Sequence, residues 1–342
     1  MSLKPVNVAV IGYGWWGKII TATLQASPLL NVVFVVESDA KVLESAQEAG
    51  KMMNFAVGKD FSEAIARPDV EAIVLCTPHQ FHAEQIQLAA KAGKHVFCEK
   101  PLCLTFKDAQ AAIAACNQAG VQLGIGHERR FEPAVMTMRE EITKGTLGVV
   151  LQIEANFSQD KFFALPPDNW RLSNKFAPVG PLTATGIHLV DLAIAILGPA
   201  ESVWARLATR GSQFENGDTL GIMLAFPGGA NALISAILAT PFDGRFCVYG
   251  SKGWMEIRDN THPENPTGWN ITTQLRGEEK KTHFMPPAPT VRSNLEAFAN
   301  GIRGVAPYPV SQQEMLANVG ALEAIMRSAA SRKIEEIQKL SS

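Results

Sequence analysis

The chain has 342 residues, of which 46% are hydrophobic and 19% are charged, and its formal net charge is −2. This is the composition of a folding globular chain, and its length favours two domains over one core. Because the chain has no basic excess and no run of lysine and arginine, we expect neither nucleic acid nor an anionic membrane as a partner.

Five cysteines are scattered along the chain without a CxxC pair, at residues 76, 98, 103, 116 and 247. An odd number of unpaired cysteine positions favours a reducing compartment over a disulfide framework. No cluster of cysteine and histidine has the spacing of a zinc site, so we expect no metal. The first apolar run, Val6–Ile11, is too short for a signal peptide. The longest apolar region, Gly221–Phe242, is interrupted by Pro227-Gly228-Gly229 and predicts a β-hairpin instead of a membrane span. The cytoplasm is therefore the expected location.

Short apolar runs alternate with helical patterns through the first third of the chain. The runs are rich in β-branched residues and are typical of parallel strands covered on both faces, at 6–11, 32–36, 72–76, 95–98 and 121–125. Helices are predicted over Ala83–Lys91 and over Thr105–Ala119, which begins with a capping-box pattern and ends at Gly120. This order predicts an α/β Rossmann domain with a doubly wound parallel sheet over residues 1–125.

The pattern changes after residue 125. A helix is predicted over Ala134–Lys144, and longer alternating segments predict strands near 149–158, 201–210, 219–226, 230–239 and 245–249. A helix from about Thr183 to Leu197 interrupts them, and two helices, near 294–302 and from Ser311 onward, end the chain. We expect an α+β domain with a mainly antiparallel sheet over residues 126–342, used for substrate binding and oligomerisation.

The first strand runs directly into the glycine-rich turn Gly12-Tyr-Gly14-Trp-Trp-Gly17. Gly12 allows a tight turn, Gly14 lets the backbone approach a pyrophosphate, and Gly17 lets the helix pack close to the sheet. The phosphates then meet free N–H groups at the start of the helix, including those of Trp15 and Trp16. The pattern predicts a dinucleotide site; the alternative is a tight strand-to-helix turn without a ligand.

Glu37 ends the second strand, twenty residues after Gly17. An acid at this point can accept hydrogen bonds from the adenine ribose and repels a 2′-phosphate, which favours NAD over NADP. The alternative is a solvated loop carboxylate, and the nearby Lys41 would soften the discrimination.

Two further motifs follow strands whose carboxyl ends meet at the ligand-binding edge of such a sheet. One strand ends in Cys76-Thr77-Pro78-His79-Gln80-Phe81-His82 and the next in Cys98-Glu99-Lys100-Pro101. A lysine there can take the proton of a hydroxyl as hydride leaves the carbon, if its pKa falls from about 10.4 toward neutrality. The alternative role for Lys100 is an anion clamp without proton transfer.

Together with these motifs, five later segments resemble the glucose–fructose oxidoreductase/inositol dehydrogenase (Gfo/Idh/MocA) family over nearly the whole chain. They are His127-Glu-Arg-Arg130-Phe-Glu-Pro133, Trp170-Arg171, Gly180-Pro-Leu182, Gly186-Ile-His188-Leu-Val-Asp191 and Phe298-Ala-Asn-Gly-Ile. The resemblance implies that Lys100 is the catalytic lysine and that His188 is a second catalytic group, a proton relay or a ligand of the substrate hydroxyl. It also implies that Thr77, Pro78 and His82 line the ribose side of the cofactor, with Glu99 beside them.

One position departs from the family pattern. Many dehydrogenases of this family carry an aspartate four residues before the histidine, where this chain has Ala184. The neighbouring Thr185 can hydrogen-bond a substrate but is no general base near neutral pH. Asp191, three residues after His188, can orient the imidazole, although a helix or domain-packing contact is the favoured interpretation.

Further substrate-side candidates are Arg130, Trp170 and Arg171, since arginine grips carboxylates or vicinal hydroxyls and tryptophan offers a face to sugar C–H groups. The alternative for the arginines, including Arg129, is salt bridging between domains.

We therefore expect an NAD(H)-dependent oxidoreductase, assembled as a homo-oligomer, that acts on a secondary alcohol or ketone of a sugar, cyclitol or related polyol. One alternative is a non-catalytic regulatory protein of the same fold that binds NAD(H) or a sugar. Another is glycoside cleavage through a transient oxidation without net NADH.

Overall fold

The computed structural model describes residues 4–339, which form two compact units. The first comprises the chain up to Glu128 together with Pro289–Met315, and the second comprises Arg129–Ala288 together with the chain from Leu316 onward. The chain therefore returns to the first unit near its end, in contrast to a single division between residues 125 and 126.

The first unit contains a six-stranded parallel sheet in the order β3-β2-β1-β4-β5-β6. The strand order reverses between β1 and β4, which is the switch point where doubly wound sheets bind their ligands. This sheet confirms the predicted Rossmann fold. Its strands are β1 (Val6–Ile11), β2 (Leu30–Val36), β3 (Ala56–Gly58), β4 (Ala72–Leu75), β5 (His95–Cys98) and β6 (Leu123–Ile125).

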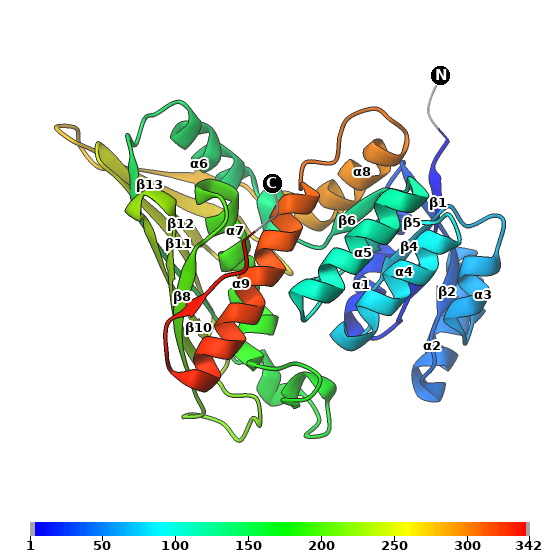
Figure 1. Cartoon of the computed structure of the whole chain (residues 1–342). Helices are drawn as coiled ribbons and strands as arrows, with labels where there is room; N and C mark the ends of the chain where they lie inside the picture. The colour runs from blue at the N-terminus through cyan, green and yellow to red at the C-terminus, as the bar shows by residue number, and fades with distance from the viewer. Residues whose placement is uncertain (1–3, 340–342) are drawn as a thin grey trace. The chain divides into compact units, whose positions relative to one another are not determined.

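Helices connect these strands, and Figure 1 shows α4 and α5 side by side over one face of the sheet. Their ends follow the sequence signals: the Thr105 hydroxyl accepts a hydrogen bond from Asp108 N at 3.1 Å, and α5 ends at Gly120 with φ +65°. The helices are α1 (Trp15–Gln25), α2 (Ala40–Met53), α3 (Phe61–Ala66), α4 (His82–Lys91) and α5 (Phe106–Ala119).

Side-chain hydrogen bonds attach helix α8 (Thr290–Ile302) and the loop after it to the first unit. Tyr308 donates to Ile125 O at 3.0 Å, and Asn294 donates to the same oxygen at 2.9 Å. Arg303 forms an ion pair with Glu71 at 2.7 Å. These contacts, with Ile125 at the end of β6 and with Glu71 just before β4, explain why residues 289–315 belong to the Rossmann unit.

The second unit is built on a nine-stranded sheet in the order β14-β13-β12-β11-β7-β10-β9-β8-β15. All its pairs are antiparallel except the parallel pair β10–β7, so the mainly antiparallel prediction is confirmed. The predicted hairpin is formed by β9 and β10. The strands are β7 (Val150–Ser158), β8 (Ser202–Ala208), β9 (Thr219–Ala225), β10 (Asn231–Ile237), β11 (Asp243–Gly250), β12 (Gly253–Asp259), β13 (Trp269–Leu275), β14 (Lys281–Met285) and β15 (Glu335–Glu336).

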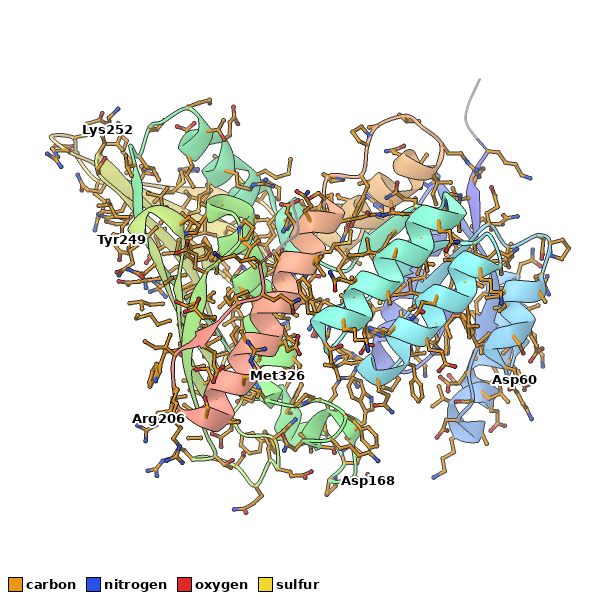
Figure 2. The ribbon with its side chains drawn as sticks, viewed as in Figure 1. Asp60, Asp168, Arg206, Tyr249, Lys252 and Met326 are labelled. Atoms are coloured by element: carbon orange, nitrogen blue, oxygen red, sulfur yellow. The ribbon has the colours of Figure 1, made fainter. Side chains whose placement is uncertain are left out.

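One face of this sheet is buried and the other is open. Helices α6 (Pro133–Thr143) and α7 (Ile187–Leu197) contact the sheet on its buried face, and α9 (Gln312–Ser331) crosses from the first unit into the second. In Figure 2, Arg206 and Tyr249 lie on the side of the sheet away from Met326 of α9. Within residues 4–339, no helix combines the length and apolar character needed to cross a membrane.

Candidate active site

The glycine turn between β1 and α1 has the geometry of a phosphate cradle. Gly12 has φ +90° and lies against Cys76, so a Cβ there would stand 3.0 Å from the Cys76 carbonyl oxygen. A Cβ on Gly17 would stand 1.9 Å from Gly12 O, whereas a Cβ on Gly14 would meet open space. No side chain caps α1 at Gly14, and the N-terminus of a helix is a favourable place for an anion. The turn therefore fits a pyrophosphate.

Glu37 lies at the end of β2 beside this turn. Its two carboxylate oxygens accept hydrogen bonds from Tyr13 N at 2.7 Å and Asp39 N at 2.9 Å. The carboxylate thus ties the glycine turn to the second strand, and each oxygen keeps a lone pair for a further donor. The structure brings Glu37 and the glycine turn together, while its contact with a ribose stays a prediction.

A buried histidine joins the two sequence motifs at the carboxyl edge of the sheet. Thr77 and Pro78 follow β4, and the Thr77 hydroxyl hydrogen-bonds Gln85 of α4 at 2.6 Å. His82 Nε2 lies 2.9 Å from Thr77 O, and Nδ1 lies 2.8 Å from Pro101 O. Burial lowers the pKa of His82, so the ring is neutral and donates to one carbonyl at a time. His82 therefore positions the turn that follows β5.

Glu99 and Lys100 lie on that turn. Lys100 is half-buried, and its backbone N–H donates to Glu99 Oε2 at 3.3 Å. The Glu99 carboxylate is 8% exposed and lies over Gly126, where a Cβ would stand 2.5 Å from Oε2. Burial raises the pKa of Glu99 to about 7, opposed by the Trp16 indole N–H and by the charge of Lys100. The same carboxylate contributes to the raised pKa of the half-buried Cys76 thiol.

In the second unit, His188 lies in the first turn of α7 and is 5% exposed. Its ring centroid lies 6.1 Å from that of Phe157, which in turn lies 5.5 Å from that of His262. His262 Nε2 lies 2.7 Å from the amide oxygen of Gln159. The sequence does not indicate Phe157, Gln159 or His262 as site residues, because only the folded chain links them to His188 through this series of contacts.

Buried ion pairs of two arginines lie at the start of this unit. Arg130 donates to both carboxylate oxygens of Asp191, at 2.7 Å each, and both side chains are 2% exposed. Arg129 pairs with Glu132 at 2.9 Å and with Asp259 at 2.8 Å. These contacts agree with the packing interpretation of Asp191, and the salt bridges of Arg129 lie within one unit. A substrate contact of Arg130 stays a prediction.

The remaining substrate-side candidates lie near α7. The Arg171 guanidinium stacks on Trp170, 4.4 Å from the ring centroid. The Thr185 hydroxyl is buried and donates to Pro181 O at 3.2 Å within the short π-helical turn η5 (Leu182–Gly186). Ala184, the position at which the chain departs from the expected family pattern, packs against an apolar cluster. The cluster contains Leu172, Phe214 and Leu238, with Phe162 and Leu165 packed against it.

Asn216 is a positioning residue with no sequence signal. The side-chain NH2 group of Asn216 donates to Arg171 O and to Ala177 O, both at 2.7 Å. The backbone carbonyl of Asn216 accepts from Gly180 N at 2.7 Å. Val179, next to Gly180, has φ +51°, an unfavourable conformation for a β-branched residue. Asn216 thus holds the loop of Arg171 and the strained entry to η5 in one arrangement.

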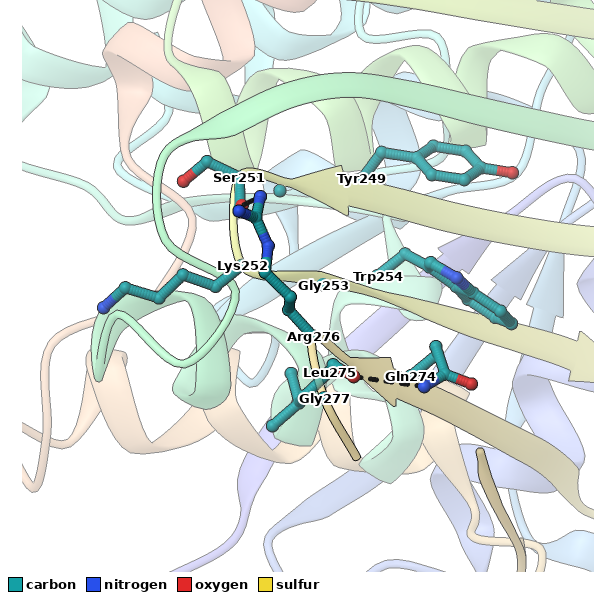
Figure 3. A pocket seen from close by; sticks show the side chains of 10 residues that line it. Tyr249, Ser251, Lys252, Gly253, Trp254, Gln274, Leu275, Arg276 and Gly277 are labelled. Atoms are coloured by element: carbon teal, nitrogen blue, oxygen red, sulfur yellow. Dashed lines mark hydrogen bonds between the residues drawn. The ribbon is translucent and has the colours of Figure 1, made fainter. Parts of the chain in front are cut away.

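A pocket of about 320 Å³ lies elsewhere in the second unit, at the turn between β11 and β12 (Figure 3). Tyr249, Trp254 and Gln274 form a row along one wall, and the predicted site residues are not part of its lining. Among residues 4–339, no group of three or more His, Cys, Asp or Glu side chains could hold a metal ion.

Residues 6–127 match a family model described as an oxidoreductase family with an NAD-binding Rossmann fold, and residues 135–256 match the GFO/IDH/MocA C-terminal domain. The chain belongs to the Gfo/Idh/MocA oxidoreductase family. The first unit of this Gfo/Idh/MocA protein is an NAD-binding Rossmann domain, which confirms the resemblance, the fold and the cofactor predicted from the sequence.

Relatives of this Gfo/Idh/MocA protein carry different activities. It is 28% identical to 1,5-anhydro-D-fructose reductase from Ensifer adhaerens over 94% of its own length and 98% of the relative's. It is 24% identical to scyllo-inositol 2-dehydrogenase (NADP(+)) from Bacillus subtilis, over 97% of its own length and 96% of the relative's. The crystal structure of aldose-aldose oxidoreductase from Caulobacter crescentus matches with a TM-score of 0.85 at 26% identity, covering 98% and 100%. Membership therefore indicates a dehydrogenase and leaves the substrate open.

Proposed function

We propose that this protein transfers a hydride between NAD(H) and a secondary alcohol or ketone of a sugar, cyclitol or related polyol. Its relatives are named for an anhydrofructose, an inositol and aldoses, which supports this substrate class. The observation that carries the proposal is the position of Lys100, at the carboxyl edge of an NAD-binding sheet on a turn held by His82.

Lys100 is the proposed proton acceptor. A nicotinamide bound at this edge would supply the acceptor for the hydride that leaves the carbinol carbon. Lys100 Nζ takes the hydroxyl proton in the same reaction and the carbonyl remains; in the reverse direction Nζ returns that proton. His82 and Glu99 act on the turn that carries Lys100, so they position this amine.

The cofactor contacts are proposed from the first unit alone. The backbone of the glycine turn would hold the pyrophosphate, and Glu37 would accept from the ribose and repel a 2′-phosphate, so we propose a preference for NAD over NADP. The proposed set is Gly12, Gly14, Trp15, Trp16, Gly17, Glu37, Thr77, Pro78, His82, Glu99 and Lys100.

His188 is the proposed second catalytic group, and its unit supplies the remaining substrate contacts. The Phe157 ring lies beside the imidazole, and this contact supports the proposal that His188 is held in position to meet a substrate hydroxyl. We propose that the stacked pair Trp170–Arg171 contacts the sugar. Arg130 and Thr185 are also proposed as substrate contacts, although each already donates a hydrogen bond within the protein, to Asp191 and to Pro181 O.

A homo-oligomer is proposed through the open face of the nine-stranded sheet. Trp204, Met223 and Leu233 lie in register on neighbouring strands of this face and are 39%, 43% and 39% exposed. Beside them, the side chains of β7, β11 and β12 form a network of both signs, including Arg245 with Glu154 and Glu256.

A second copy of the chain is the occupant that best fits this face. Its charges are balanced, so an identical face is electrostatically acceptable, unlike a strongly charged partner. Nine strands about 4.8 Å apart and about six residues long cover roughly 800 Å², the area that each partner of a stable interface contributes.

We also propose a cytoplasmic location, because the cysteines are odd in number and scattered along the chain, which favours a reducing compartment.

The test of the proposed function is an absorbance screen for NADH with NAD+ and a panel of anhydro sugars, aldoses, inositols, other polyols and sugar acids. Turnover with one or more of these substrates is the expected result. No turnover with any of them, together with NAD(H) binding that changes affinity for a protein partner, would replace this function with the regulatory one.

A further inference from the structure

We infer that Glu99 is a redox-state selector, a buried carboxylate that makes the protein bind NAD+ in preference to NADH. The inference needs only NAD binding by the first unit, and it stands apart from the proposed reaction of Lys100.

The sheet topology places Glu99 on the nicotinamide half of the site. The glycine turn follows β1, at the switch point between β1 and β4, and receives the pyrophosphate. Glu37 follows β2 on one side of that point, the side of the adenine ribose. Glu99 follows β5 on the other side, where the nicotinamide half of a dinucleotide belongs.

The Glu99 carboxylate is enclosed by the ends of three strands and the glycine turn. It lies over Gly126 after β6, where a Cβ would stand 2.5 and 2.8 Å from its two oxygens. The Trp16 indole of the glycine turn lowers the pKa of this carboxylate, and the carboxylate raises the pKa of Cys76 at the end of β4. At 8% exposure the carboxylate is largely desolvated, so its charge acts on neighbouring groups with little screening by water.

The nicotinamide ring carries a positive charge in NAD+ and none in NADH. An ionised Glu99 therefore attracts the oxidised ring and is indifferent to the reduced one, whereas a protonated Glu99 distinguishes them little. Since burial raises the pKa of Glu99 to about 7, this selectivity changes within the physiological range of pH. By reciprocity, bound NAD+ favours the ionised carboxylate and releases its proton.

Other ionisable groups face the same carboxylate. Lys100 lies next to it on the β5 turn, and the thiols of Cys76 and Cys98 have pKa values raised well above their usual range by burial, so they stay neutral. His127 follows Gly126 at the end of β6 and is 2% exposed. Loss of a proton from His127 would change NAD+ affinity in the same direction as ionisation of Glu99, so the test must separate them.

The experiment measures the dissociation constants of NAD+ and NADH by calorimetry, with the cofactor-free chain at pH 5.5 to 8.5. For the wild type we expect NAD+ affinity to rise about tenfold across this range, with NADH affinity changing about twofold or less, the scale of one poorly screened charge pair. Glu99→Gln should bind NAD+ about tenfold more weakly than wild type at pH 8.5, and the ratio of its affinities for NAD+ and NADH should not change with pH. The matched control is Glu84→Gln on the surface of α4, which should behave as wild type.

Two results would overturn the inference. A wild-type ratio of the two affinities that does not change with pH would show that Glu99 does not sense the redox state. A Glu99→Gln protein that keeps the full pH dependence would assign it to another group, His127 first. If the glutamine variant does not fold, Glu99→Asp keeps the charge on a shorter side chain and must keep the direction of the wild-type pH dependence.

Discussion

The buried carboxylate of Glu99 also makes the stability of the cofactor-free protein depend on pH. In the folded chain burial raises its pKa from an ordinary 4.5 to about 7. The folded state therefore holds the proton more tightly than the unfolded state does, so stability is full below pH 4.5 and is lost as pH rises toward 7. A difference of about 2.5 pKa units corresponds to about 3 kcal/mol.

Glu99→Gln removes the titration and keeps the shape of the side chain. The free energy of unfolding of the variant, relative to wild type, should therefore increase by about 3 kcal/mol between pH 4.5 and 8. Scanning calorimetry of the cofactor-free chain at several pH values measures this difference through the transition temperatures. Two proteins whose transition temperatures change in parallel with pH would refute a buried, proton-holding Glu99.

Three other predictions concern separate features. Asp191→Asn removes the charge of a carboxylate that accepts two hydrogen bonds from the buried Arg130 guanidinium and should cost about 3–5 kcal/mol of stability by calorimetry, whereas Glu140→Gln, in an exposed pair, should cost less than about 1 kcal/mol. Glu37→Ala should narrow the difference in affinity between NAD(H) and NADP(H), and equal affinities in the wild type would remove Glu37 from its role. Trp204→Glu should shift the mass measured by light scattering toward the monomer, and an unchanged mass would exclude the open face as the interface.

Local sequence signals predicted the elements of the first unit well. Parallel strands buried on both faces leave uninterrupted apolar runs, and glycines at Gly12 and Gly120 meet backbone conformations that other residues disfavour. The capping residue Thr105 acts within three residues of its partner, so its role is readable without the fold. The glycine turn and the Glu99-Lys100 motif belong to the same class of local signals.

Long-range contacts were outside the reach of such signals. Nothing near Tyr308 in the sequence indicates that its hydroxyl reaches Ile125, yet this contact assigns residues 289–315 to the Rossmann unit. Arg130 meets Asp191 sixty-one positions away, and Asn216 holds a loop more than forty positions upstream. Such partners share no spacing or period, because only tertiary packing brings them together.

The central claim is that Lys100 accepts the proton while hydride leaves the substrate, and the pH–rate profile of Lys100→Met against wild type tests it most directly. Methionine keeps much of the length of lysine but carries neither charge nor proton acceptor. With the substrate found in the screen, the wild-type rate of alcohol oxidation should rise with pH through the pKa of the base. The variant should lose that dependence and about 10²–10⁴ of the rate, while NAD+ binding changes far less. A variant with near-normal turnover and the wild-type profile would contradict the claim.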